Sequence, residues 1–118
     1  MATDHKARIE AVNTAFSSDN IEAFLELCTD DVEMGMVGGP RLQGKDAIRT
    51  EMGKNDVWNP PVIHVTDILI DGDKAVCDGL MEMNKKSGEE HRYGYVDCYT
   101  FREGMISAIR TYMTEIKD

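Results

Sequence analysis

The spacing of apolar residues changes along this 118-residue chain, from a helical period in the first third to a strand period in the second half. The first third opens with three apolar residues at helical spacing: Ile9, Val12 and Phe16. Thr3 or Asp4 can cap this helix, which we expect to run to about Ser17. The polar residues that follow predict a break before a second helix.

The second predicted helix opens at Asp19, because Glu22 stands three residues later, as in a capping box. Its apolar residues again recur at helical spacing: Ile21, Phe24, Leu25 and Cys28. Residues 32–37 then form a candidate strand, and the segment 38–40 forces a loop because it contains two glycines and a proline. A third, short helix is predicted over 44–52.

The second half, beyond Asn59-Pro60-Pro61, carries the signals of consecutive strands joined by tight turns. We predict strands over 62–70, 74–84, 92–101 and 105–116. Helices first and antiparallel strands last are typical of an α+β fold, in one domain spanning residues 1–118. We expect the N-terminal helices to cover the concave side of a curved antiparallel sheet, which forms a conical barrel around a pocket.

One face of the strand over 92–101 combines aromatic residues with a carboxylate. Alternation along the strand places the following residues on that face: Tyr93, Tyr95, Asp97, Tyr99 and Phe101. A carboxylate on an apolar face is unfavourable unless it is neutral, paired or used. Asp97 is therefore the first candidate for a catalytic group. The alternative is a structural carboxylate that a tyrosine hydroxyl or Arg110 satisfies.

The register of the last two strands decides what surrounds Asp97. If the turn over 102–104 pairs Phe101 with Met105, the opposing residues are Tyr99 and Ser107, Asp97 and Ile109, Tyr95 and Thr111, Tyr93 and Met113. We expect Ile109 and Met113 to desolvate Asp97 in this arrangement and so to raise its pKa.

Further candidates lie outside this strand. His64 would supply a base beside an acid if it faces Asp97, and otherwise it is a partly buried, satisfied histidine. Trp58 either caps the pocket mouth or belongs to the core. The tyrosines and methionines contact a ligand or simply pack. The expected ligand-contacting residues are Phe16, Met36, Trp58, Tyr93, Tyr95, Tyr99, Ile109 and Met113.

The composition of the chain limits which classes of partner the protein can bind. The chain has 13 basic and 22 acidic residues, a net charge of −9, which makes nucleic acids and anionic membranes poor partners. No apolar run is long enough to span a bilayer. The three cysteines stand far apart, and no metal-ligand or phosphate-loop motif occurs, so we expect reduced thiols in a cytoplasmic protein and no cofactor or metal.

Several phrases, in a fixed order over nearly the whole chain, carry a family resemblance: Asn20-Ile21-Glu22-Ala23-Phe24, Thr29-Asp30-Asp31-Val32, Leu42-Gln43-Gly44-Lys45-Asp46-Ala47-Ile48, Ile70-Asp71-Gly72-Asp73-Lys74-Ala75-Val76, Val96-Asp97-Cys98-Tyr99-Thr100-Phe101 and Gly104-Met105-Ile106 to Tyr112. Together they resemble the NTF2-like superfamily, in its SnoaL-like and ketosteroid-isomerase-like branch. The resemblance implies a cone-shaped, cystatin-like α+β fold that binds a small apolar molecule, usually as a homodimer through the outer sheet face. Its members include isomerases, cyclases, dehydratases, epoxide hydrolases and non-catalytic modules, so the fold leaves the function open.

The resemblance also implies roles for single residues. Asp97 falls where ketosteroid isomerases hold a protonated aspartic acid in their oxyanion hole. His64 falls near the strand position of a catalytic histidine in the dehydratases. Val12 and Met36 fall where the isomerases place a tyrosine and a general-base aspartate, so that mechanism is not expected here. The expected function is acid–base chemistry of lyase, isomerase or cyclase type on a small apolar substrate. The alternative is a non-catalytic ligand-binding or dimerisation module.

Overall fold

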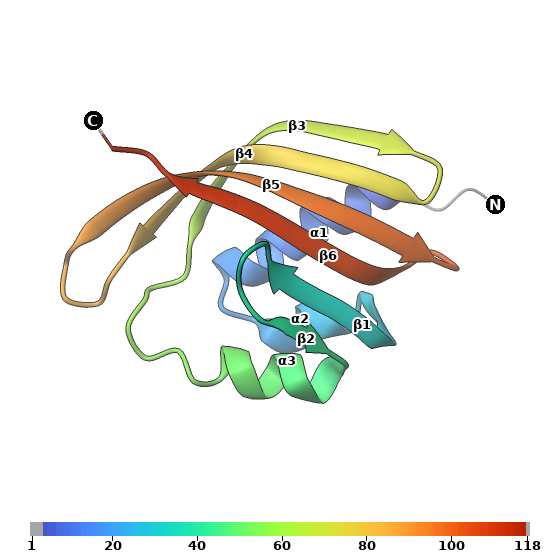
Figure 1. The fold of residues 1–118 in the computed structure, drawn as a ribbon, viewed down its shortest axis with the longest axis horizontal. Coiled ribbons are helices and arrows are strands. Elements are labelled where there is room, and N and C mark those ends of the chain that lie inside the picture. Colours follow the sequence, from blue (N-terminus) through green and yellow to red (C-terminus); the bar gives the residue numbers. More distant parts are fainter. Residues whose placement is uncertain (1–3, 118) are drawn as a thin grey trace.

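The computed structural model describes residues 4–117, which form three helices and six strands (Figure 1). The helices are α1 (His5–Ser17), α2 (Ile21–Leu25) and α3 (Lys45–Met52). The strands are β1 (Cys28–Met36), β2 (Arg41–Gln43), β3 (Val62–Asp71), β4 (Lys74–Asn84), β5 (Glu90–Arg102) and β6 (Met105–Glu115). The predicted α+β fold is confirmed, with helices before the main run of strands.

All six strands belong to one curved sheet in the order β2-β1-β6-β5-β4-β3 (Figure 1). The sheet is open, with β2 and β3 at its edges, and so the expected barrel does not close. The antiparallel strands predicted for the second half are confirmed in β3–β6, whereas β1 runs parallel to β6. Strand β2, helix α3 and the loop that follows it separate β1 from β3–β6 in the chain, so no tight turn forces β1 and β6 to run antiparallel.

Helix α1 packs on the concave face of the sheet and provides one wall of the core. Its inward residues Ile9 and Val12 are fully buried and cluster with sheet residues that include Phe101 and Ile106. Asp4 caps the helix by accepting a hydrogen bond from the amide of Ala7 at 2.9 Å. The alternative cap, Thr3, lies outside the described residues. No helix within residues 4–117 is long and apolar enough to cross a membrane.

Two local predictions in the first half are wrong by a few residues. The cap of α2 is Asn20, which accepts a hydrogen bond from the amide of Ala23 at 3.1 Å, because Asp19 adopts a left-handed backbone conformation at φ 55°. Strand β1 begins at Cys28 rather than at residue 32, since α2 ends after little more than one turn. The short edge strand β2 was not predicted.

The β5–β6 register differs from the prediction by two residues. The turn contains only Glu103 and Gly104, both with positive φ, so Arg102 rather than Phe101 pairs with Met105. A bulge next to Thr100 then shifts the pairing by one more residue. As a result Asp97 pairs with Thr111 and not with Ile109, and all the opposing pairs predicted above are wrong.

Candidate functional site

Asp97 lies in a row of inward-facing residues that crosses the sheet. The strand register aligns Met36 on β1, Thr111 on β6, Asp97 on β5, Cys77 on β4 and Ile68 on β3. Side chains in one such row share a face of the sheet. We call these five residues the Asp97 row.

Asp97 is held by a single protein hydrogen bond. The hydroxyl of Thr111 donates to Asp97 Oδ1 at 2.6 Å, while Oδ2 has no hydrogen-bond partner within residues 4–117. Protein surrounds most of the side chain, yet part of it stays accessible. Burial raises the pKa of Asp97 to about 6, against the opposing effect of the Thr111 hydrogen bond. Arg110, one expected partner, pairs with Cys98 on the opposite face.

Neutral polar groups surround this carboxyl. Tyr95 Oη lies 3.8 Å from Cys77 Sγ, and Asn13 on α1 donates to the same sulfur from 3.9 Å. Burial raises the pKa of Tyr95 and of Cys77, so both stay protonated near neutral pH. Tyr99 is fully buried, and its hydroxyl has no hydrogen-bond partner in the described part of the chain. The site therefore combines one group that titrates near neutral pH with neutral donors.

His64 does not face Asp97, so the condition for an acid–base pair between the two residues is not met. It pairs with the exposed Leu80 on the outer face, its side chain is 57% exposed, and its Nε2 lies 2.6 Å from Glu82 Oε2. The neighbouring residue Ile63 packs against the core instead. Both sides of β3 are largely apolar, and so the sequence did not indicate which side faces inward.

Trp58 and Tyr93 lie near one end of the concave face, together with a histidine that the sequence reading passed over. His91 packs edge-on against Trp58 at 5.4 Å between ring centroids and stacks on Tyr93 at 6.4 Å. Its two ring nitrogens lie 2.6 Å and 2.7 Å from carboxylate oxygens of Glu89 and Glu115, which raise the pKa of His91. His91 is six residues from Asp97 along the strand, about 20 Å, too far for direct proton transfer.

The remaining expected contact residues fall in two groups. Ile109 and Met113 flank Thr111 on β6 and are the diagonal neighbours of Asp97, with Ile109 only 5% exposed. Met36 shares the Asp97 row but is 48% exposed at its edge. Phe16 is half-buried and packs against Phe24 at 4.8 Å between ring centroids.

Sequence reasoning missed Asn13, Cys77 and Thr111. The sequence could have indicated Asn13, because asparagine is a poor helix former and here lies within α1, beside the buried Val12. Thr111 would have been found had the two-residue turn and the bulge been anticipated. Within residues 4–117, no group of three or more His, Cys, Asp or Glu side chains is placed to hold a metal ion, and Cys28, Cys77 and Cys98 are unpaired.

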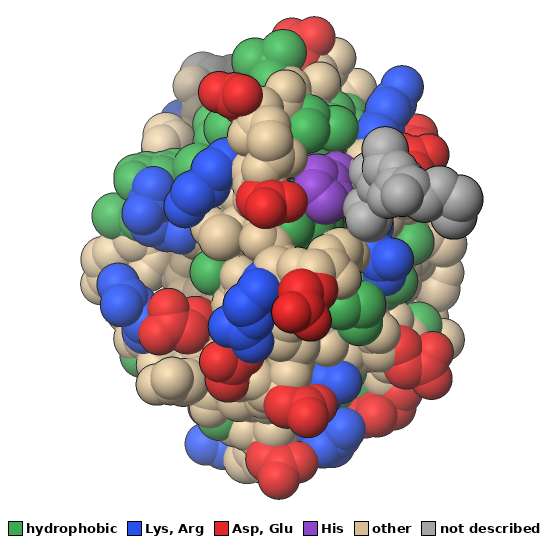
Figure 2. All heavy atoms as spheres, turned by 90° about the vertical axis from the view of Figure 1, so that its right-hand side faces the viewer, with side chains coloured by type: hydrophobic (Ala, Val, Ile, Leu, Met, Phe, Trp, Pro, Cys, Tyr) green, Lys and Arg blue, Asp and Glu red, His purple; other side chains and the backbone are tan. Residues whose placement is uncertain are grey.

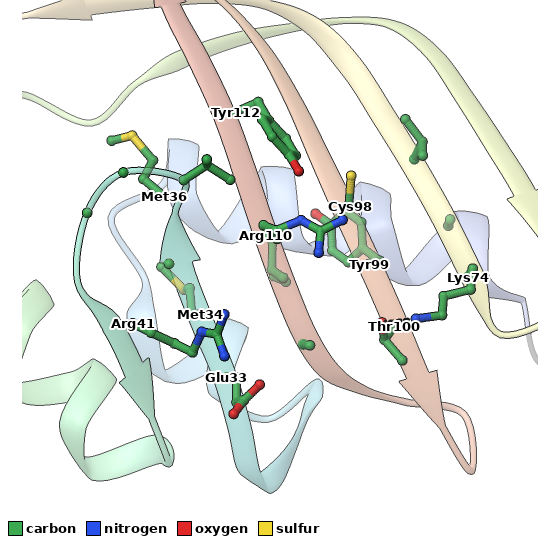
Figure 3. A pocket seen from close by; sticks show the side chains of 18 of the residues that line it. Glu33, Met34, Met36, Arg41, Lys74, Cys98, Tyr99, Thr100, Arg110 and Tyr112 are labelled. Atoms are coloured by element: carbon green, nitrogen blue, oxygen red, sulfur yellow. Dashed lines mark hydrogen bonds between the residues drawn. The ribbon is translucent and has the colours of Figure 1, made fainter.

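A separate cavity of about 710 Å³ opens on the face of the sheet opposite the helices (Figure 3), and Asp97 is not among its lining residues. Its lining comes from β1, β2, the loop between them and the outer sides of β4, β5 and β6. We call this cavity the outer groove. Its position differs from that of the conical pocket expected over the concave face.

Solved structures with the same fold include proteins of several reaction classes. An LEH-like epoxide hydrolase from M. tuberculosis is 16% identical with TM-score 0.80, and the match covers 92% of this chain and 80% of that one. A proposed polyketide cyclase from Xanthomonas campestris pv. campestris is 17% identical with TM-score 0.83, over 91% and 87%. A proposed ketosteroid isomerase from Kribbella flavida is 18% identical with TM-score 0.74, over 95% and 78%.

These identities establish a common fold and leave the activity open. The comparison with curated protein sequences returned no match. The family model of the SnoaL-like domain matches residues 9–109, which include Asp97 and reach from α1 into β6. The chain therefore belongs to the SnoaL-like domain family.

Proposed function

We propose that this protein binds a small, largely apolar molecule against the concave face of the sheet and that Asp97 exchanges a proton with it. The observation that carries the proposal is the state of Asp97. One carboxyl oxygen is held by Thr111, the other is unpaired within the described residues, and burial raises the pKa to about 6. Such a group is positioned by the protein but keeps one oxygen available for a ligand.

A carboxyl with this pKa can donate a proton below about pH 6 and accept one above it. Tyr95 and Cys77, which share this face of the sheet, stay neutral and can act only as hydrogen-bond partners. We therefore propose chemistry in which one carboxyl carries the proton, as in a lyase, isomerase, cyclase or epoxide-opening reaction. The epoxide hydrolase and the proposed cyclase among the structural neighbours support these reaction classes.

The ketosteroid isomerase mechanism is not part of this proposal. Val12, at the position of the helix tyrosine, is fully buried in the core. Met36, at the position of the general base, shares the Asp97 row but presents a thioether that cannot accept a proton near neutral pH. Of the three groups that the mechanism uses, only the aspartic acid has a counterpart here.

A non-catalytic binding module is the second candidate. It is favoured by the absence, among residues 4–117, of a second group that titrates near neutral pH within reach of Asp97. Homodimerisation also stays a proposal. It is supported by exposed apolar side chains on the outer face of β3 and β4, which include Val62, Leu69 and Leu80.

The test compares wild type with Asp97→Asn and, as a control, Asp67→Asn on the exposed part of β3. Styrene oxide opening and deuterium exchange at the α-carbon of small ketones would be measured between pH 4 and 9. We expect Asp97→Asn to lower the rate of whichever reaction the wild type catalyses by about 100-fold or more. The wild-type rate should change near pH 6.

Unchanged turnover in Asp97→Asn would contradict the catalytic proposal. Binding of these compounds without turnover, lost in Asp97→Asn and kept in Asp67→Asn, would instead support the non-catalytic module.

A further inference from the structure

The outer groove has a floor of small side chains on neighbouring strands. One row across the sheet runs from Arg41 through Gly35 and Arg110 to Cys98. The adjacent row contains Ala108 and Thr100 between longer side chains on either side. The hollow forms because these floor residues are short: Gly35, Cys98, Thr100 and Ala108.

Gly35 is required at its position in this floor. A Cβ atom there would lie 2.9 Å from the carbonyl oxygen of Pro40 and 3.2 Å from the Cα of Arg41. The close approach of β2 to β1 therefore depends on glycine. Because Gly35 has no side chain, space stays open between Arg41 and Arg110, whose Cα atoms are two strand spacings apart, about 10 Å.

The walls of the groove are cationic in a strongly acidic protein. Arg41, Lys74 and Arg110 line it, and Glu33 is the only carboxylate among the described lining residues. None of the three cations forms an ion pair within residues 4–117. The chain as a whole carries 22 acidic and 13 basic residues, and the two kinds are interspersed on the face shown in Figure 2.

The cations are oriented over the floor of the groove. Figure 3 shows Lys74 reaching from β4 toward Thr100, where its Nζ lies 3.1 Å from the hydroxyl oxygen. Arg110 extends from β6 beside Cys98, and its guanidinium carbon lies 5.5 Å from the centre of the Tyr112 ring. This packing of Arg110 on an aromatic ring limits the freedom of its side chain before any ligand arrives.

We propose that the outer groove binds a small organic anion through a carboxylate or phosphate group, with an apolar or planar body. Arg41 and Arg110 can each pair with either kind of anion, and Lys74 adds a third positive charge. Val37, Val76 and Tyr112 supply the apolar part of the lining. The volume of about 710 Å³ fits a molecule of this size.

This site is separate from the proposed function. Cys98 and Thr100 on β5 face the groove, while Asp97 points to the concave side and is not among the residues that line the groove. A ligand in the outer groove thus does not touch the carboxyl of Asp97. Failure of either proposal leaves the other standing.

The test is an NMR titration of the protein with benzoate and with phenyl phosphate, with benzyl alcohol as the neutral control. We expect either anion to shift the amide signals of β5 and β6 around Cys98 and Arg110, and benzyl alcohol not to do so.

Arg110→Gln and Lys74→Gln should each weaken binding about tenfold. Ala108→Phe fills the floor and should abolish binding. Lys86→Gln, in an exposed turn, and Asp97→Asn should bind as wild type.

The two probes distinguish the head group, because the tighter one identifies the anion that the groove prefers. The proposal would be overturned if Arg110→Gln and Ala108→Phe bound each anion as tightly as wild type does. Loss of binding in Asp97→Asn would also overturn it, because that result would move the site to the concave face.

Sedimentation of the same variants adds a further check. A wild-type dimer that takes up neither anion and that Ala108→Phe converts to monomer would identify the groove as an interface and overturn the proposal.

Discussion

Asp97→Asn should stabilise the protein at pH 8 by on the order of 2 to 3 kcal/mol and change its stability little near pH 3.5. The carboxyl has a folded-state pKa of about 6, above its ordinary value of 3.8. Between these two values the unfolded chain releases the proton while the folded chain keeps it. The native state therefore loses stability as the pH rises from about 4 to about 6, and the loss is complete above that range.

Asparagine removes this titration while keeping the shape of the side chain and an oxygen that can accept the hydrogen bond of Thr111. The measurement is urea unfolding of wild type and Asp97→Asn at several pH values. Asp67→Asn, at an exposed position, reports any general effect of the exchange. A difference between wild type and Asp97→Asn that does not vary with pH would contradict the assigned environment of Asp97.

Gly79→Ala should destabilise the fold by more than about 3 kcal/mol, because no space exists for a side chain at this point of β4. A Cβ atom on Gly79 would lie 2.2 Å from the carbonyl oxygen of His64 and 3.1 Å from Tyr95 Oη. The clash with His64 involves backbone on the paired strand, next to the bulge between Val65 and Asp67. Relief of the clash requires β3 to move away from β4.

Gly94→Ala is the matched control, since Gly94 lies on the adjacent strand opposite Leu80 and a Cβ atom there has no neighbour within 4 Å. We expect its stability to change by less than about 1 kcal/mol. Chemical denaturation of both variants measures the difference directly. Equal stability of Gly79→Ala and Gly94→Ala would show that β3 does not approach β4 as closely as described.

The elements of the second half were predictable because their signals are local. The turn at Asp71-Gly72-Asp73 separates β3 from β4 as expected, and β4 has the predicted bounds over 74–84. The position of Asp97 on an aromatic, inward face followed from strand alternation alone. These features depend on residues close together in the sequence.

The partners of Asp97 were not predictable in the same way. The register depends on Glu103, a residue other than glycine with positive φ, and on a bulge that no residue type marks clearly. A shift of two residues keeps every side chain on its face, which is why Ile109 and Met113 still flank the site although Thr111 replaces Ile109 as the direct neighbour of Asp97.

His64 shows the same limit on β3. Each side of this strand carries apolar residues, and the bulge between Val65 and Asp67 changes the alternation within it. Only the pairing with β4 places His64 on the outer face, beside Glu82 rather than Asp97. An acid–base pair inferred from two separate strands therefore required the tertiary structure to test it.

The pKa of Asp97 itself tests the central claim most directly. The protein would be labelled with ¹³C, the carboxyl signal of Asp97 assigned by its loss in Asp97→Asn, and its chemical shift followed from pH 3 to pH 9. A partly accessible carboxyl that burial keeps from ionising should titrate at about pH 6. A titration at or below the ordinary value of 3.8 would contradict the account, because Asp97 would then be an ordinary ionised carboxylate with no proton to exchange near neutral pH.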